Sequence, residues 1–272
     1  HAKAAQGVRV VTDKLIFFEP VALRNQTDGV EPSAAPFPVA GAVYAPHIYT
    51  LAFSDPRGEL ARLTYERLAP SVRGARVEAT AWGAPLFIGE FGIAPDAPNA
   101  ALWLRYQLDA QDETLASSAL WLWKEDSQGS WGLFDKRGAD FVERPAYIAA
   151  VSRPYVQVAG GALRALRYDS EARRLRYQVQ RQRGAREDQV YLPRAPQALR
   201  CQGQDVKPLP TIDSATGVLR VRCGESDLAT VEILRRQVHR LIAPEQMGRL
   251  FKAIGLASPM LKTESSGGLA GL

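Results

Sequence analysis

Acidic and aromatic side chains close several short apolar runs, where they could act together on a bound substrate. Glu90 ends the run PLFIGEF, and His47 and Tyr49 lie two residues apart at the end of another run, Ala42–Tyr49. Residues two apart in a strand point to the same face, so we expect the imidazole and the phenol on one side. Donors of this kind would stabilise the ionised form of Glu90, the form that acts as a nucleophile.

Tryptophans occupy the next apolar run along the chain. Trp121 and Trp123 lie two residues apart in ALWLWKED, so we expect them to share one strand face, and Trp131 follows in SQGSWGLFD. An indole face suits the apolar face of a sugar ring. A single strand-end glutamate usually faces solvent, and a single histidine is usually structural. The convergence of three runs instead favours a shared binding site.

The elements that position these residues have the pattern of βα units around a parallel sheet. Apolar residues recur at helical spacing between the runs, and their default role is packing. Barrel enzymes place catalytic groups at the carboxyl ends of such strands. The predicted strands are Lys14–Glu19, Ala42–Tyr49, Pro85–Phe91 and Ala119–Glu125, and the predicted helices are Pro56–Ala81, Pro98–Ser117 and Ala146–Val151.

After Arg153-Pro154 the pattern changes to alternating strands broken by Gly, Pro and Asp, which is typical of an antiparallel sandwich. We predict a βα domain over 1–153, a β-sandwich over 154–236, and a terminal region over 237–272. The terminal region would hold an amphipathic helix, Pro244–Ile254, and a disordered tail from Ser265. The predicted sandwich strands are Leu163–Tyr168, Arg174–Gln180, Gln189–Leu192, Val218–Arg222 and Ala229–Leu234.

Composition excludes several classes of protein. The 272 residues are 46% apolar and 23% charged, which is ordinary globular usage. No run reaches the ~20 apolar residues that span a bilayer. The net charge of +5 comes from scattered arginines, so we expect no nucleic acid partner. No Cys/His cluster has metal-ligand spacing, so we expect no metal or cofactor. Cys201 and Cys223 could form one disulfide, which alone does not establish the compartment.

The succession FFEP, PHIYT, GEFG and WLWKEDSQGSWGLFD, followed by RPYVQVAGG, resembles the endoglycoceramidase branch of glycoside hydrolase family 5. The resemblance implies α/β plus all-β architecture: the C-terminal half of a (β/α)8 TIM barrel, strands five to eight, followed by an antiparallel β-sandwich. It implies that Glu90 is the nucleophile, with His47 and Tyr49 beside it. The substrate-binding residues that it implies are Trp123 or its neighbour Trp121, Lys124 and Trp131.

The sequence departs from that family at the acid/base. The family carries this residue in an Asn-Glu-Pro motif on the fourth barrel strand, and the present sequence contains no Asn-Glu pair. Glu19-Pro20 lies on the wrong strand to replace it, and we expect Glu19 instead to line the cleft or to support the residues that do. We therefore expect a fragment, a processed half or a truncated gene product that is inactive alone. An N-terminal half-barrel would supply the acid/base.

The leading hypothesis is retaining hydrolysis of the glycan–lipid bond of glycolipids such as glycosylceramides. One rival is a related glycosidase that acts on steryl glucosides or β-glucans, and another is a non-catalytic glycan- or lipid-binding fragment. The arginine-rich strands suggest peripheral contact with a membrane surface. The resemblance favours a secreted or extracellular protein, although we find no signal peptide in the first residues.

Overall fold

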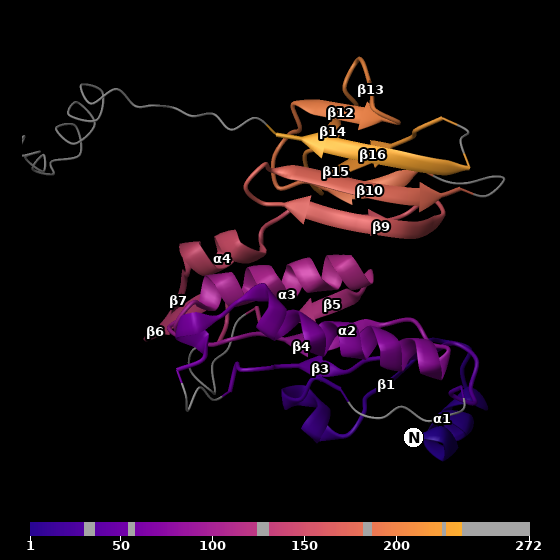
Figure 1. The fold of residues 1–272 in the computed structure, drawn as a ribbon, viewed down its shortest axis with the longest axis vertical. Coiled ribbons are helices and arrows are strands. Elements are labelled where there is room, and N and C mark those ends of the chain that lie inside the picture. Colours follow the sequence, from indigo (N-terminus) through magenta and orange to yellow (C-terminus); the bar gives the residue numbers. More distant parts are fainter. Residues whose placement is uncertain (30–35, 54–57, 124–130, 182–186, 225–226, 236–272) are drawn as a thin grey trace, which may run out of the picture. The chain divides into compact units, whose positions relative to one another are not determined.

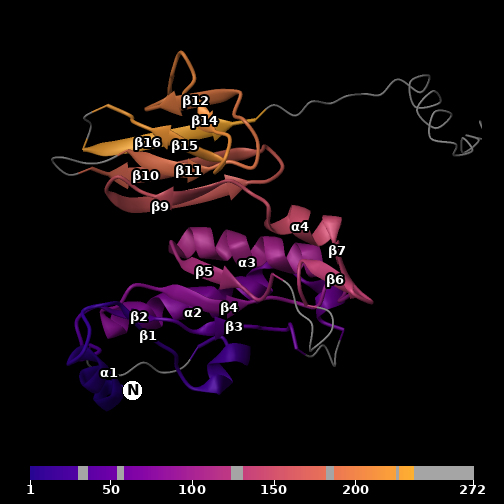
Figure 2. The same cartoon turned by 180° about the vertical axis from the view of Figure 1, so that it is seen from behind.

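The computed structural model describes residues 1–29, 36–53, 58–123, 131–181, 187–224 and 227–235 (Figures 1 and 2). The predicted helix Pro244–Ile254 and the predicted tail lie outside these residues. Parallel strands, helices and an antiparallel hairpin occupy the earlier part of the chain, and antiparallel sheets occupy the later part. The predicted mixed α/β character is confirmed. The predicted domain boundaries stay a prediction.

The earlier part contains short parallel strands in sequence order. β1 pairs with β2, and β3, β4 and β5 form a second parallel sheet. A bridge between Tyr44 and Leu86 connects the two sets. Among the described residues these strands do not close into a barrel. The elements are α1 Ala2–Arg9, β1 Ile16–Phe18, the 3-10 helix η1 Ala22–Gln26, β2 Ala42–Tyr44, β3 His47–Ile48, the 3-10 helix η2 Leu60–Arg62, α2 Tyr65–Trp82, β4 Phe87–Phe91, α3 Ala100–Thr114, β5 Ser117–Leu120, β6 Phe134–Arg137, β7 Asp140–Glu143 and α4 Pro145–Val151.

Several predicted strands have different limits in the structure, and two of the differences bear on the predicted site residues. The run Ala42–Tyr49 divides into β2 and β3 at Pro46, because proline has no N–H for the ladder. β5 ends at Leu120, before both tryptophans. The carbonyls of Leu122 and Trp123 both accept from the N–H of Leu133, at 3.1 and 3.0 Å, instead of continuing a ladder with β4. The prediction that Trp121 and Trp123 share one strand face was therefore wrong.

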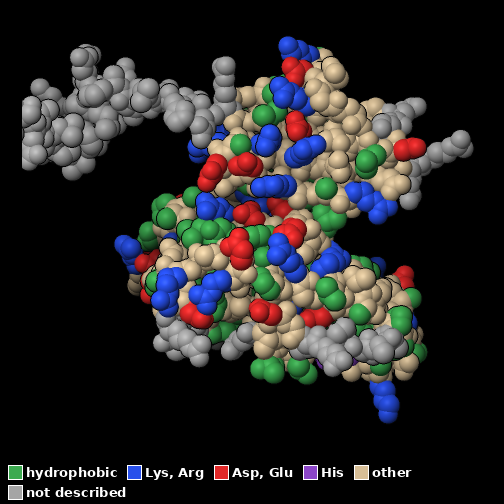
Figure 3. All heavy atoms as spheres, viewed as in Figure 1, with side chains coloured by type: hydrophobic (Ala, Val, Ile, Leu, Met, Phe, Trp, Pro, Cys, Tyr) green, Lys and Arg blue, Asp and Glu red, His purple; other side chains and the backbone are tan. Residues whose placement is uncertain are grey.

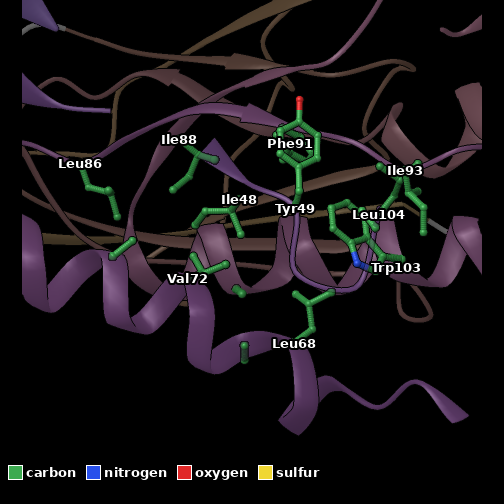
Figure 4. Close-up of a cluster of buried hydrophobic side chains, with 14 of the residues drawn as sticks. Ile48, Tyr49, Leu68, Val72, Leu86, Ile88, Phe91, Ile93, Trp103 and Leu104 are labelled. Carbon is green, nitrogen blue, oxygen red and sulfur yellow. The ribbon is translucent and has the colours of Figure 1, made fainter. Parts of the chain in front are cut away.

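The helices pack against the parallel strands. Buried side chains of α2 and α3 meet those of β3 and β4 in one core, which Figure 4 shows around Ile48, Ile88, Leu68 and Trp103. These four side chains have no exposed surface. The predicted helix that started at Pro56 was too long, since the described chain forms η2 first and α2 begins at Tyr65. α2 ends at Gly83, which adopts the left-handed conformation with φ 63° that favours glycine.

A buried ion pair fixes η1 beneath the strand ends. Arg24 is fully buried, and its Nε lies 2.9 Å from Oε2 of Glu78 on α2. The Tyr44 hydroxyl donates to the same carboxylate. The carbonyl of Asn25, the next residue of η1, accepts from the N–H of Tyr49 at 2.8 Å. The ion pair thus helps to fix the backbone that carries Tyr49.

The later part forms two antiparallel sheets around a second core. Their strand orders are β13-β12-β16-β10-β9 and β14-β15-β11-β8. Alternate residues of β10 and β16 are buried, and they share one cluster with Val190, Leu219 and Val221 of the other sheet. The strands are β8 Tyr155–Val158, β9 Ala162–Asp169, β10 Arg174–Gln180, β11 Asp188–Tyr191, β12 Ala198–Cys201, β13 Gln204–Asp205, β14 Ile212–Asp213, β15 Val218–Val221 and β16 Leu228–Leu234.

A disulfide joins these two sheets. Cys201 ends β12 in one sheet, and Cys223 follows β15 in the other. The two sulfurs are bonded, which answers the question that the sequence left open. The bond closes a loop between residues 22 positions apart, so it restricts the unfolded chain.

We expect reduction of this disulfide to lower the free energy of unfolding by about 3 kcal/mol. A cross-link that closes a loop of this size reduces the conformational entropy of the unfolded chain by an amount worth that free energy. Urea unfolding with and without dithiothreitol measures the difference. The Cys201→Ser/Cys223→Ser double variant is the control and should not respond to dithiothreitol. Equal stability of the oxidised and reduced chains would contradict the expectation.

Candidate active site

The site is built on the parallel pairing of β3 with β4, in which His47 lies opposite Glu90. The Tyr49 hydroxyl donates to Oε2 of Glu90 at 2.7 Å, and Nδ1 of His47 lies 3.2 Å from the same oxygen. Glu90 is 28% exposed, so it is open to a ligand. The predicted convergence of these three side chains is confirmed, and their catalytic roles stay a prediction.

Tyr49 combines a buried ring with a polar end. Its ring belongs to the core, and Figure 4 shows its hydroxyl on the side away from Leu68 and Val72. Burial raises the pKa of the phenol well above its ordinary value, and the hydrogen bond to Glu90 and the charge of that carboxylate raise it further. The phenol therefore keeps its proton at neutral pH and acts as a donor to Glu90.

Two glycines flank Glu90, and both are required by close approaches. A Cβ on Gly89 would lie 2.9 Å from Cδ2 of His47, so any larger residue would displace the imidazole. A Cβ on Gly92 would lie 2.2 Å from the carbonyl oxygen of Trp121. The motif GEFG therefore has a packing reason: one glycine admits the imidazole from β3, and the other admits the backbone that follows β5.

Glu19 joins the same cluster from the chain directly after β1. Its Oε1 lies 3.3 Å from Nδ1 of His47, and the side chain is 41% exposed. The sequence predicted that Glu19 lines the cleft or supports the residues that do, and the structure brings this carboxylate to the imidazole that also lies beside Glu90.

Aromatic rings extend the site from Tyr49. The ring of Trp131 lies 6.0 Å from that of Tyr49, and Phe53 contacts both rings at 5.4 and 4.6 Å. Sequence reasoning missed Phe53, although it lies four residues after Tyr49 and is 54% exposed. A large apolar residue within four residues of the predicted strand end was the available signal.

The other predicted substrate-binding residues differ in their placement. The backbone N–H of Trp121 donates to the carbonyl of Phe91 at 2.8 Å, which places this residue beside the end of β4. Trp123 instead packs on Phe134, with ring centroids 5.0 Å apart. Lys124 lies outside the described residues. The structure thus brings Trp131 and Glu19 to the cluster around Glu90 and Trp121 to the adjoining strand end, and it shows Trp123 against β6.

One oxygen of Glu90 faces two polar groups, the Tyr49 hydroxyl that donates to it and Nδ1 of His47. Within the described chain no group of three or more His, Cys, Asp or Glu residues could hold a metal ion. No described helix is long and apolar enough to cross a membrane.

Comparison with solved structures gives the fold a known relative. The chain is similar to endo-glycoceramidase II from Rhodococcus sp. in a cellobiose-like imidazole complex, with a TM-score of 0.66, 24% identity, and coverage of 86% of this chain and 53% of that chain. The ganglioside GM3 complex of that enzyme gives a TM-score of 0.67 with 24% identity, over 86% of this chain and 53% of that one. Sterylglucosidase 1 from Cryptococcus neoformans gives a TM-score of 0.50 with 15% identity, over 71% of this chain and 38% of that one.

These comparisons concern the fold. The predicted resemblance to endoglycoceramidase is confirmed at that level, and this chain spans about half the length of the solved structures that it resembles. No family model matches the sequence, and no curated protein matches it.

We expect Tyr49 to make stability depend on alkaline pH. The folded phenol keeps its proton above pH 10, the ordinary pKa, whereas the unfolded phenol releases it there. The free energy of unfolding should therefore fall as pH rises past that value, by up to about 1.4 kcal/mol per pH unit for this group. Urea unfolding of Tyr49→Phe and the unchanged chain, from about pH 8 to about pH 11, isolates its part from the other buried tyrosines. If the free energies of unfolding of the two chains fell by equal amounts with rising pH, Tyr49 would not be a source of this pH dependence.

Proposed function

We propose that this chain is the carboxyl-terminal portion of a retaining glycoside hydrolase that cleaves the glycan–lipid bond of glycolipids. In this proposal the βα part is half of a (β/α)8 barrel, and the two antiparallel sheets form a β-sandwich. The observation that carries it is the carboxylate of Glu90 at the carboxyl end of a parallel strand, held by Tyr49 and His47 and bordered by aromatic rings.

Glu90 is the nucleophile of this mechanism. Its carboxylate donates an electron pair to the anomeric carbon, the bond from that carbon to the leaving oxygen breaks, and a second carboxyl protonates that oxygen. Retaining enzymes place the two carboxyl groups roughly 5–5.5 Å apart. We propose that the second carboxyl comes from an amino-terminal half-barrel, as in the family that the sequence resembles.

The surface near β1 supports such a partner. β1 pairs on one side only among the described strands, which leaves backbone groups available for another strand. Phe17 of β1 also lines a cavity of about 640 Å³ together with Phe37 and Phe87. Exposed large apolar side chains cluster in the same stretch of sequence: Val8, Val10, Val11, Leu15, Phe17, Val21 and Leu23. An additional βα segment would bury this surface.

We expect a fluorosugar with a dinitrophenyl leaving group to become covalently attached to Glu90. This leaving group departs without a proton, so the reaction requires the nucleophile but not the acid. Intact-mass and peptide mass spectrometry after incubation with 2-deoxy-2-fluoro-glucosyl and lactosyl reagents would locate the adduct. Glu90→Gln should lose it.

Glu66→Gln is the matched control, since Glu66 is an exposed glutamate on α2. This variant should keep full labelling. A label on another residue, or equal labelling of Glu90→Gln, would refute the assignment of the nucleophile. No labelling of the unchanged chain would favour the rival proposal of a non-catalytic glycan- or lipid-binding fragment.

Two observations support a glycolipid substrate. The solved structures with this fold include a glycoceramidase and a sterylglucosidase. Phe53 has no polar atom in its ring, so its exposed face suits a hydrocarbon group next to the reacting sugar. Hydrolysis of glycosylceramides, steryl glucosides and cello-oligosaccharides, assayed with the complementing half present, separates the proposed substrate from its rivals.

The later sheets give less support to a lipid surface. Figure 3 shows basic side chains interspersed with acidic ones on the face in view. Arg200 pairs with Asp205 at 2.9 Å, and Arg176 lies 3.5 Å from Glu232. The proposal therefore does not depend on membrane contact. The disulfide supports an oxidising compartment, in agreement with the expected secreted protein.

We expect Phe53→Ala to weaken binding of octyl β-glucoside on the order of tenfold, because the alkyl chain loses an apolar surface worth roughly 1.5–3 kcal/mol when fully buried. Binding of methyl β-glucoside should not change. Calorimetric titration below the micelle concentration measures both. Phe17→Ala removes an equally exposed phenylalanine that contacts Phe87 instead, and it is the control. Equal losses in both variants would contradict an alkyl-binding role for Phe53.

A further inference from the structure

Two carboxylates from different strands approach one imidazole nitrogen. Nδ1 of His47 lies 3.2 Å from Oε2 of Glu90 and 3.3 Å from Oε1 of Glu19. Glu90 belongs to β4, whereas Glu19 follows β1. His47 therefore connects the candidate nucleophile to a second acidic side chain that the mechanism above does not use.

This geometry selects one state of the imidazole. Ionised carboxylates only accept hydrogen bonds, so the nitrogen between them must carry the hydrogen. A single N–H makes one well-aligned hydrogen bond at a time. Glu90 already accepts from Tyr49 at 2.7 Å, so it keeps a donor when the imidazole N–H turns to Glu19.

The position of the ring is restricted while this exchange occurs. The imidazole lies directly over Gly89, where even a Cβ would be 2.9 Å from Cδ2 and 3.1 Å from Nε2. The ring cannot move toward β4 without displacing backbone. A change of acceptor at Nδ1 is therefore a small reorientation and not a swing of the side chain.

We propose that Glu19 is a positioning residue. It accepts the hydrogen bond from Nδ1–H of His47 while Glu90 carries the glycosyl group. The inference rests on the proposed function. Formation of the ester uses an electron pair of the Glu90 carboxylate and removes its negative charge, while the leaving oxygen takes its proton from the acid of the amino-terminal half. Glu19 then remains as the anion beside the imidazole. Hydrolysis of the ester restores the charge of Glu90 and its original contact with Nδ1 of His47.

The test uses the charge of Glu90 as the variable and needs no turnover. Glu90→Gln replaces the carboxylate with a neutral amide of similar shape, as the ester does. The chain has three histidines, His1, His47 and His239, so long-range ¹H–¹⁵N spectra of the imidazoles can be assigned with single His variants. These spectra report which ring nitrogen of His47 carries the hydrogen.

We expect His47 to keep its Nδ1–H form in the unchanged chain and in Glu90→Gln. The Glu19→Gln/Glu90→Gln double variant should lose the predominance of that form and gain the Nε2–H form. Glu66→Gln in the Glu90→Gln background is the matched control and should resemble Glu90→Gln alone. Backbone amide spectra confirm that each variant is folded.

Two results would overturn the proposal. One is loss of the Nδ1–H form in Glu90→Gln while Glu19 is intact, and the other is its persistence in the double variant. These outcomes are separable from a failure of the proposed function. If the tautomer depends on Glu19 but no fluorosugar attaches to Glu90, then Glu19 positions His47 in a site that is not a glycosidase.

Discussion

The register that sets His47 opposite Glu90 is the constraint on which the site depends. It is a backbone property, set by the hydrogen bonds between β3 and β4, and a slip of one residue would turn Glu90 to the other face of the sheet. Because side chains alternate, the same register carries Tyr49 to Glu90. The glycine at position 89 completes the arrangement, since the imidazole occupies the space where a side chain would lie.

The buried ion pair between Arg24 and Glu78 supports this register, because it fixes η1, whose Asn25 carbonyl bonds the backbone of Tyr49. Arg24 and Glu78 are buried without exposed surface of note, and each has further hydrogen-bond partners, Ser71 and Tyr44 among them. A buried ion pair persists only when its geometry and its remaining hydrogen bonds are good. The carboxylates of the site differ, since Glu19 and Glu90 are partly exposed and meet one imidazole nitrogen. Full pairing fixes the scaffold, whereas a shared donor leaves the site able to respond to a change of charge.

Local pattern was enough to predict much of this arrangement. The β4 run, the helical stripes and the strand Arg174–Gln180 follow from periodicity, and the grouping of Glu90, His47 and Tyr49 follows from their places at strand ends. The placement of the tryptophans after β5 could not be predicted in this way. The N–H of Leu133, ten or more residues later, donates to the carbonyls of Leu122 and Trp123, which a strand would have used in its ladder. Phe53 and the Arg24–Glu78 pair were missed for a similar reason: their partners are brought near by the fold, and no repeat in the sequence marks them.

The same geometry shows why the proposed reaction requires a group from another segment. A glycosidic oxygen that leaves must receive a proton. Tyr49 is a poor source, since burial and Glu90 raise its pKa and its hydrogen points at the carboxylate. Nδ1 of His47 lies 3.3 Å from Glu19 and 3.2 Å from Glu90, both of which are acceptors. The described donors around Glu90 thus stabilise its negative charge and are not free to protonate a substrate. In the proposed reaction the acid approaches the sugar from the side that these residues leave open, and the edge of β1 that no described strand pairs is a place where a further strand can bring it.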